Sequence, residues 1–94
     1  MFEDISEEER INTIKSNVIS LDPLVLREFP PKQRRKYILL QIIVTKFEKG
    51  RIYKESEVND ILRPMLEDFV ALRRALIDYR FLSRAKDGST YEVI

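Results

Sequence analysis

The 94-residue chain contains no cysteine and no histidine, and it has only two glycines. Without cysteine it can form no disulfide and offers no thiolate nucleophile, and without histidine it has no imidazole base or imidazole metal ligand. Two glycines are too few for a glycine-rich phosphate-binding loop once both serve in turns. The sequence therefore predicts a protein that is not an enzyme, with no catalytic residues, no cofactor, no metal site and no small-molecule substrate.

Long apolar runs are also missing. No stretch approaches the roughly 20 apolar residues that a membrane-spanning helix needs, and the acidic start of the chain lacks the apolar core of a signal peptide. Hydrophobic residues nevertheless make up 44% of the chain, which is enough for the core of one small domain. We therefore expect a cytoplasmic protein with no membrane partner.

The formal net charge of +1 conceals an uneven distribution. Residues 1–29 carry three basic and seven acidic side chains, a net charge of −4, whereas residues 30–94 carry fourteen basic and nine acidic ones, a net charge of +5. An anionic partner would therefore bind the second part of the chain. We predict an acidic helix with its connecting segment in residues 1–28, followed by the main domain in residues 29–94.

Helix signals in the first half of the chain are local. Ser6 and Glu9 have the spacing of a capping box, and the apolar residues that follow predict an amphipathic helix over residues 7–17. A proline at the first position and no breaker before Gly50 predict a long central helix over residues 31–49. Between these helices, serine, aspartate and proline residues predict an irregular segment draped over the core.

The second half predicts one short strand and two short helices. Residues 51–54 alternate and tolerate a β conformation. Ser56 is predicted to cap a helix that ends near Arg63, because the proline that follows disfavours a helical residue before it. Asp68 is predicted to cap another helix that runs to Tyr79, so the pair has a helix-turn-helix outline.

The final segment predicts a β-hairpin. Asp87 and Gly88 are a strong local signal for a two-residue type I′ turn between strands over residues 81–86 and 89–93. This turn would place Lys86 opposite Ser89, Arg84 opposite Tyr91, and Leu82 opposite Val93. The element order of helix, short strand, helix, helix and two-stranded wing, after an extra N-terminal helix, predicts an α+β, winged-helix-like fold.

Candidate DNA-contacting residues follow from this fold. The apolar stripe of the last helix is centred on Leu72 and Leu76, which leaves Arg74 on the opposite face, where it could enter a major groove. Arg73 and Arg80 lie at the border of the stripe. A guanidinium there more often pairs with a local carboxylate, such as Glu57, Asp60 or Asp78, than with a ligand. The full set of nucleic-acid-binding candidates is Arg74, Arg73, Lys86, Arg84, Lys32, Arg34, Arg35 and Lys36.

The basic run over residues 32–36 has two interpretations. It lies in the first turns of the central helix, where the helix dipole disfavours each cation by about 0.3–1 kcal/mol. Pairing with the acidic N-terminal segment at residues 7–9, or simple solvation, is the favoured interpretation. Contact with phosphates or with an acidic protein is the alternative.

Several segments resemble the bacterial DUF2087 family, a domain of unknown function. They are Phe29-Pro30-Pro31-Lys32, residues 50–62, Asp68, residues 72–78, and Leu82-Ser83-Arg84 with Gly88 and Tyr91. Members of this family occur alone and at the carboxyl end of ArsR-type transcriptional regulators. The resemblance implies a winged-helix-like fold and an association with transcription control, without an implied reaction or ligand.

Two functions remain open at this point. The first is a non-enzymatic, DNA-binding or transcription-regulatory module whose partner is double-stranded DNA. The alternative is a protein–protein interaction or dimerisation domain of a regulatory system. In that case Val70 and Ile77, beside Arg74, would form a mixed apolar and basic patch for a protein partner or a second copy of the chain.

Overall fold

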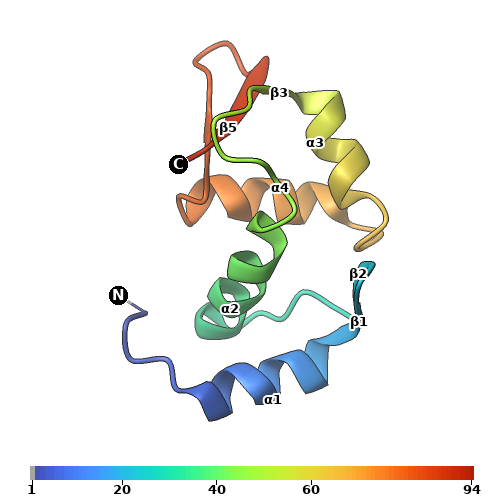
Figure 1. Cartoon of the computed structure of the whole chain (residues 1–94), viewed down its shortest axis with the longest axis vertical. Helices are drawn as coiled ribbons and strands as arrows, with labels where there is room; N and C mark the ends of the chain where they lie inside the picture. Colours follow the sequence, from blue (N-terminus) through green and yellow to red (C-terminus); the bar gives the residue numbers. More distant parts are fainter. Residues whose placement is uncertain (1) are drawn as a thin grey trace.

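The computed structural model describes residues 2–94, and it has the α+β architecture that the sequence predicts (Figure 1). The elements are α1 (Glu7–Asn17), β1 (Val18–Leu21), β2 (Leu24–Leu26), α2 (Gln33–Val44), β3 (Tyr53–Lys54), α3 (Glu55–Leu62), α4 (Phe69–Asp78), β4 (Leu82–Arg84) and β5 (Thr90–Val93). In Figure 1, α4 lies across the middle of the molecule, with α1 and α2 below it and the β3–β5 sheet above it. Each helix within residues 2–94 is too short or too polar to span a bilayer.

The winged-helix-like arrangement is confirmed by the three-stranded sheet. Its strand order is β3-β5-β4, and both pairs of neighbours are antiparallel. Strand β3 enters the sheet between α2 and α3, while β4 and β5 form the wing after α4. The wing is therefore tied back to the helices through β3, because β5 bonds both to its hairpin partner and to this distant strand.

The core is built around α2 and α4. Helix α2 buries more than one stripe, because consecutive residues Ile38, Leu39 and Leu40 are all fully inaccessible to solvent. Leu72 and Leu76 of α4 are also fully buried, which confirms the inward stripe predicted for this helix. With this stripe turned inward, the opposite face of α4 is left for solvent.

Helix α2 is shorter than the sequence predicts at both ends. It begins at Gln33, because Lys32 has extended backbone angles and serves as the N-cap, so the predicted start at residue 31 is wrong. It ends at Val44, where the next N–H groups bond to carbonyls three residues back. This tighter turn brings Phe47 into the core against the ring of Tyr53, at a centroid distance of 5.3 Å. The predicted end of the helix at residue 49 is therefore wrong, because the turn that buries Phe47 ends the helix first.

The start of α3 differs from the prediction by two residues. The helix begins at Glu55 directly after β3, so Lys54 and not Ser56 is the N-cap. The Glu57 carboxylate accepts a hydrogen bond of 2.8 Å from the Lys54 N–H and satisfies the cap from inside the helix. The end of α3 at Leu62 agrees with the prediction.

Helix α4 begins as predicted and ends slightly early. The Asp68 side chain accepts a hydrogen bond from the Ala71 N–H at 3.3 Å, which confirms the predicted N-cap. The helix ends at Asp78 instead of Tyr79, and Arg80 then has a positive φ of 64°. A left-handed residue at this position stops the helix, as glycine commonly does elsewhere.

The predicted register of the wing is confirmed, but its turn is wider. The pairs Leu82–Val93 and Arg84–Tyr91 are observed as predicted. The predicted pair of Lys86 with Ser89 is absent, because the Ala85 N–H instead bonds to the Thr90 carbonyl at 2.9 Å. A type I′ turn needs positive φ at both central residues, whereas in this turn of the described chain only Gly88 has it, at 76°. The Asp87 carboxylate accepts from the Ser89 N–H at 3.0 Å and stabilises the longer loop.

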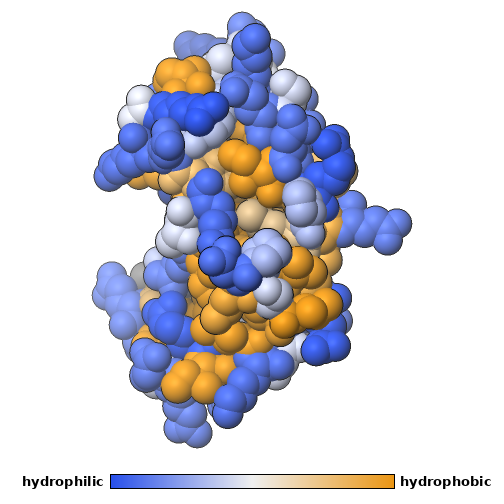
Figure 2. Space-filling view, turned by 45° about the vertical axis from the view of Figure 1, so that its right-hand side comes forward, coloured by the Kyte–Doolittle hydropathy of each residue, from blue (hydrophilic) through white to orange (hydrophobic). Residues whose placement is uncertain are grey.

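Residues 18–26 form a small hairpin that the sequence analysis treats as irregular. Strands β1 and β2 pair antiparallel, and Leu24 and Leu26 turn into the core. The opposite strand leaves Ile19 and Leu21 exposed. Figure 2 shows apolar side chains gathered over the lower half of one face, the half that holds α1 and this hairpin in Figure 1. The predicted boundary after residue 28 lies in the loop between β2 and α2.

Candidate nucleic-acid interface

A cleft of about 230 Å³ lies where α4 meets the wing. Its walls are formed by Arg73, Arg74, Ile77, Asp78, Arg84 and Tyr91. Three of the eight candidate residues therefore meet at one site, and Lys86 is exposed on the adjacent wing loop. The confirmed pairing between β4 and β5 makes this possible, because it holds Arg84 directly opposite Tyr91.

Arg74 and Arg84 are the cations of this cleft that can reach a ligand. Both side chains are exposed, and no hydrogen bond or ion pair within residues 2–94 engages either guanidinium. Arg84 folds over the wing loop, where a Cβ built on Gly88 would lie 3.4 Å from its Nη2 atom. This distance is an ordinary van der Waals contact, so the positive φ of Gly88, and not crowding by Arg84, is what favours glycine at this position.

Arg73 forms part of the floor of the cleft. Its side chain is only 17% exposed, its Nη1 donates to the Asn59 Oδ1, and its Nε lies 3.6 Å from the Glu55 Oε1. These partners differ from the carboxylates expected from the sequence. They are Glu55 and Asn59, which lie one turn apart on α3 and contact Arg73 of α4. Arg73 therefore has the structural position that its place at the stripe border indicates.

The same Glu55 oxygen joins α3 to the wing. It accepts a hydrogen bond of 2.6 Å from the Tyr91 hydroxyl. This bond and the neighbouring Arg73 guanidinium lower the pKa of the Glu55 carboxyl, while burial and the same bond raise the pKa of the Tyr91 phenol. The network of Arg73, Glu55 and Tyr91 thus connects α4, α3 and β5 beneath the cleft and fixes the wing against the helix.

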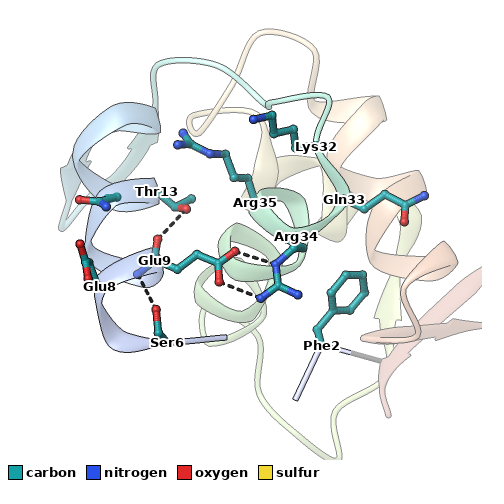
Figure 3. Close-up of a pocket in the computed structure, with 10 residues that line it drawn as sticks. Phe2, Ser6, Glu8, Glu9, Thr13, Lys32, Gln33, Arg34 and Arg35 are labelled. Atoms are coloured by element: carbon teal, nitrogen blue, oxygen red, sulfur yellow. Dashed lines mark hydrogen bonds and ion pairs between the residues drawn. The ribbon is translucent and has the colours of Figure 1, made fainter. Parts of the chain in front are cut away.

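The basic run on α2 lies at a different place, against α1. Arg34 donates from Nε and Nη2 to the two oxygens of Glu9 at 2.7 and 2.8 Å (Figure 3). Its Nη1 donates to Asp4 at 2.9 Å. Arg35 donates to the Asn17 side chain at 3.3 Å. The structure therefore agrees with the favoured interpretation at Arg34, because its guanidinium forms ion pairs with carboxylates of the acidic N-terminal segment.

The two lysines of this run have other surroundings. Lys36 lies 5.6 Å from the centroid of the Phe29 ring, which is a cation–π distance. Lys32 is exposed at the rim of a cleft of about 700 Å³ between α1 and α2. None of the four candidates from α2 lines the cleft at α4, so the eight candidate residues divide between two separate surfaces.

Two features of these surfaces are missing from the sequence prediction. Arg80 is exposed and makes no ion pair within the described part of the chain, although a local carboxylate partner is the sequence expectation. Phe2 stacks on Tyr37, at a centroid distance of 4.6 Å. A lone aromatic residue near the chain start carries no periodic signal, so only the tertiary structure reveals this contact.

The apolar patch of the alternative function is only partly accessible. Val70 and Ile77 are half-buried, and Ile77 packs against the core.

Acid is expected to weaken the attachment of the N-terminal segment to α2. The Arg34 hydrogen bonds lower the pKa of both the Glu9 and the Asp4 carboxyls. A carboxyl whose pKa is lower in the folded state stabilises that state above its unfolded pKa, near 4, and loses this contribution as pH falls further. We expect the urea midpoint of the wild-type chain to decrease as the pH is lowered from about 5 to about 3. The urea midpoint of the Arg34→Gln variant should decrease less over the same pH range. The matched control is Lys15→Gln, and an Arg34→Gln curve parallel to wild type would contradict the assignment.

The comparison with protein families covers most of this architecture. The chain has no significant match among curated proteins or among solved structures. The sequence model of one family matches residues 25–93. The match includes most of β2, all of α2, β3, α3 and α4, and the whole wing, and it leaves α1 and β1 outside. Because this match spans far more than half of the chain, the protein belongs to the DUF2087 family, described as an uncharacterized protein conserved in bacteria.

Proposed function

We propose that the protein is a cytoplasmic, non-enzymatic module of transcription control that binds double-stranded DNA through α4 and the wing. One observation carries this proposal: Arg74 from α4 and Arg84 from β4 are exposed at one cleft, and neither forms an ion pair or a hydrogen bond with a carboxylate in residues 2–94. Carboxylates pair with Arg73 in this cleft and with Arg34, Arg51 and Arg63 elsewhere in the chain. Other exposed cations of the described chain also lack an ion pair, but Arg74 and Arg84 are the two that share a cleft where a winged helix offers its helix and wing.

The geometry supports a division of roles between helix and wing. Arg74 projects from the solvent face of α4, where an arginine can bond to the O6 and N7 of guanine or to a phosphate. Arg84 and Lys86 lie on the wing, and we assign them to phosphates, which position a protein without reading its sequence. Asp78 also lines the cleft and repels phosphate. The DNA backbone is therefore expected to cross nearer to Arg84 than to the end of α4.

A salt titration tests this proposal directly. If Arg74, Arg84 and Lys86 neutralise three phosphates, log K should fall against log salt with a slope of about −2.7. A labelled mixed-sequence duplex, followed by fluorescence anisotropy, should then bind about 40-fold more weakly in roughly 200 mM salt than in roughly 50 mM salt. No binding at the lower salt concentration would reject DNA as the partner, and affinity that does not change with salt would reject the assigned phosphate contacts.

A further inference from the structure

The small hairpin of β1 and β2 has one free edge. Within residues 2–94, β1 pairs only with β2, in a sheet of two strands. The other edge of β2 is covered, because the Leu26 N–H donates to the Met65 carbonyl at 2.8 Å. The outer edge of β1 therefore offers N–H and C=O groups that no strand of the described chain pairs with.

Strand β1 also lacks the residues that keep edge strands from associating. The two edge strands of the other sheet each carry a cation, Lys54 on β3 and Arg84 on β4. Strand β1 has the sequence Val-Ile-Ser-Leu, which contains neither a charge nor a proline. Charged residues and prolines on an edge hinder pairing with another strand. Of the uncovered edge strands in residues 2–94, β1 is thus the one without such a residue.

The face of β1 that points away from the core is apolar. Ile19 is 60% exposed and Leu21 is 51% exposed. Ile19 also has no partner residue on β2, because the pairing register shifts between Val18 and Ser20. Figure 2, which turns the side of this hairpin forward, shows apolar side chains gathered in the same region. Water therefore contacts two large apolar side chains that a further strand would cover.

A second copy of the chain fits this edge by symmetry. If two β1 strands pair antiparallel about a two-fold axis at Ser20, Ile19 of each copy lies opposite Leu21 of the other, on one face of the sheet. The same register brings Asp22 of each copy to the C-terminal end of α1 of the other, where Lys15 is exposed. Neither Asp22 nor Lys15 forms an ion pair within residues 2–94, so their opposite charges are complementary across the axis.

We propose that two copies of the chain associate through β1 and form a four-stranded sheet with the order β2-β1-β1-β2. The strand has only four residues, and the bulge at Ile19 shortens its regular edge. The buried area is then below the roughly 1,200 Å² of stable complexes, so we expect a weak dimer with a Kd of about 0.1–1 mM. This inference does not depend on DNA binding, because no residue of β1 lines the α4–wing cleft. Strand β1 also lies outside the family match over residues 25–93, so the surface belongs to the segment that precedes the family domain.

Sedimentation equilibrium of the full chain tests the association. The average mass should rise from that of a monomer toward that of a dimer as the concentration increases from about 20 µM to about 1 mM. Ile19→Lys places a charge on the free edge and should raise the Kd at least about tenfold. The matched control is Ile52→Lys, which makes the same change at a 55% exposed position beside the other sheet and should leave the Kd unchanged. Circular dichroism checks that both variants fold.

A cysteine placed on the two-fold axis tests the register. The chain has no cysteine, so Ser20→Cys introduces a single thiol. Directly opposite residues of an antiparallel pair have Cβ atoms about 4.5–5.5 Å apart, close to the separation that a disulfide bridges. With oxidised glutathione as the oxidant, a non-reducing gel should show the cross-linked dimer at least about tenfold faster than for Ser83→Cys, which carries its thiol on the edge strand β4.

Charge exchange tests the ends of the paired strands. Lys15→Glu should raise the Kd about two- to fivefold, and the further change Asp22→Lys should restore it. A chain that stays monomeric up to about 1 mM, or equal effects of Ile19→Lys and Ile52→Lys, would overturn the proposal. Equally fast cross-linking of the two cysteine variants would overturn it as well, because the contact would then not be centred on Ser20. Should Ile19→Lys not fold, the two cysteine variants decide.

Discussion

Replacing Arg74 and Arg84 together by glutamine is expected to weaken binding to duplex DNA about 100-fold in roughly 100 mM salt. Each arginine is assigned one contact with a base edge or phosphate, and each such contact contributes about 1–3 kcal/mol. The salt slope should become shallower by about two units, because two fewer counterions are released. Fluorescence anisotropy over a salt series measures both quantities.

The fold should survive this double substitution. Both side chains are exposed and form no hydrogen bond or ion pair within residues 2–94, so their removal leaves no buried partner unsatisfied. The matched control is Lys15→Gln/Lys46→Gln, which removes the same charge from exposed positions on α1 and after α2. An equal loss of affinity in the two double variants would show that net charge, and not the α4–wing cleft, determines binding.

Leu76→Ala is expected to lower the free energy of unfolding by about 2–5 kcal/mol, a large part of the 5–15 kcal/mol typical of a domain. Leu76 is fully buried on the stripe of α4 that meets the core. Its truncation removes apolar contact and leaves a cavity between α4 and its neighbours. Urea unfolding followed by circular dichroism measures the change.

The surface residue Ile52 provides the comparison. Its side chain is 55% exposed, so Ile52→Ala should change the free energy of unfolding by no more than about 0.5 kcal/mol. Similar losses for the two variants would mean that α4 does not turn Leu76 inward. In that case Arg74, on the opposite face of α4, would not be the exposed residue that the DNA-binding proposal requires.

Sequence signals were most reliable where a few neighbouring residues determine the structure. The bounds of α1, the Asp68 cap and the wing register were all predicted correctly. In each case the hydrogen bonds join residues close in sequence, so local residue types are sufficient. The length of α2 was predicted incorrectly, because its end depends on where Phe47 can be buried. That depends on Tyr53, which belongs to another element.

The candidate site shows the same division more sharply. The sequence by itself determined that the chain has no cysteine or histidine chemistry, that it forms a winged-helix-like domain, and which arginines are candidates for an anionic partner. It favoured pairing of the basic run that contains Arg34 with the acidic N-terminal segment, but it left contact with phosphates open as the alternative. Only the tertiary structure decided that Glu9, 25 residues away, engages Arg34, whereas no carboxylate within residues 2–94 reaches Arg74. The energy of an ion pair depends on the distance between two charges, and folding sets that distance for residues far apart in sequence.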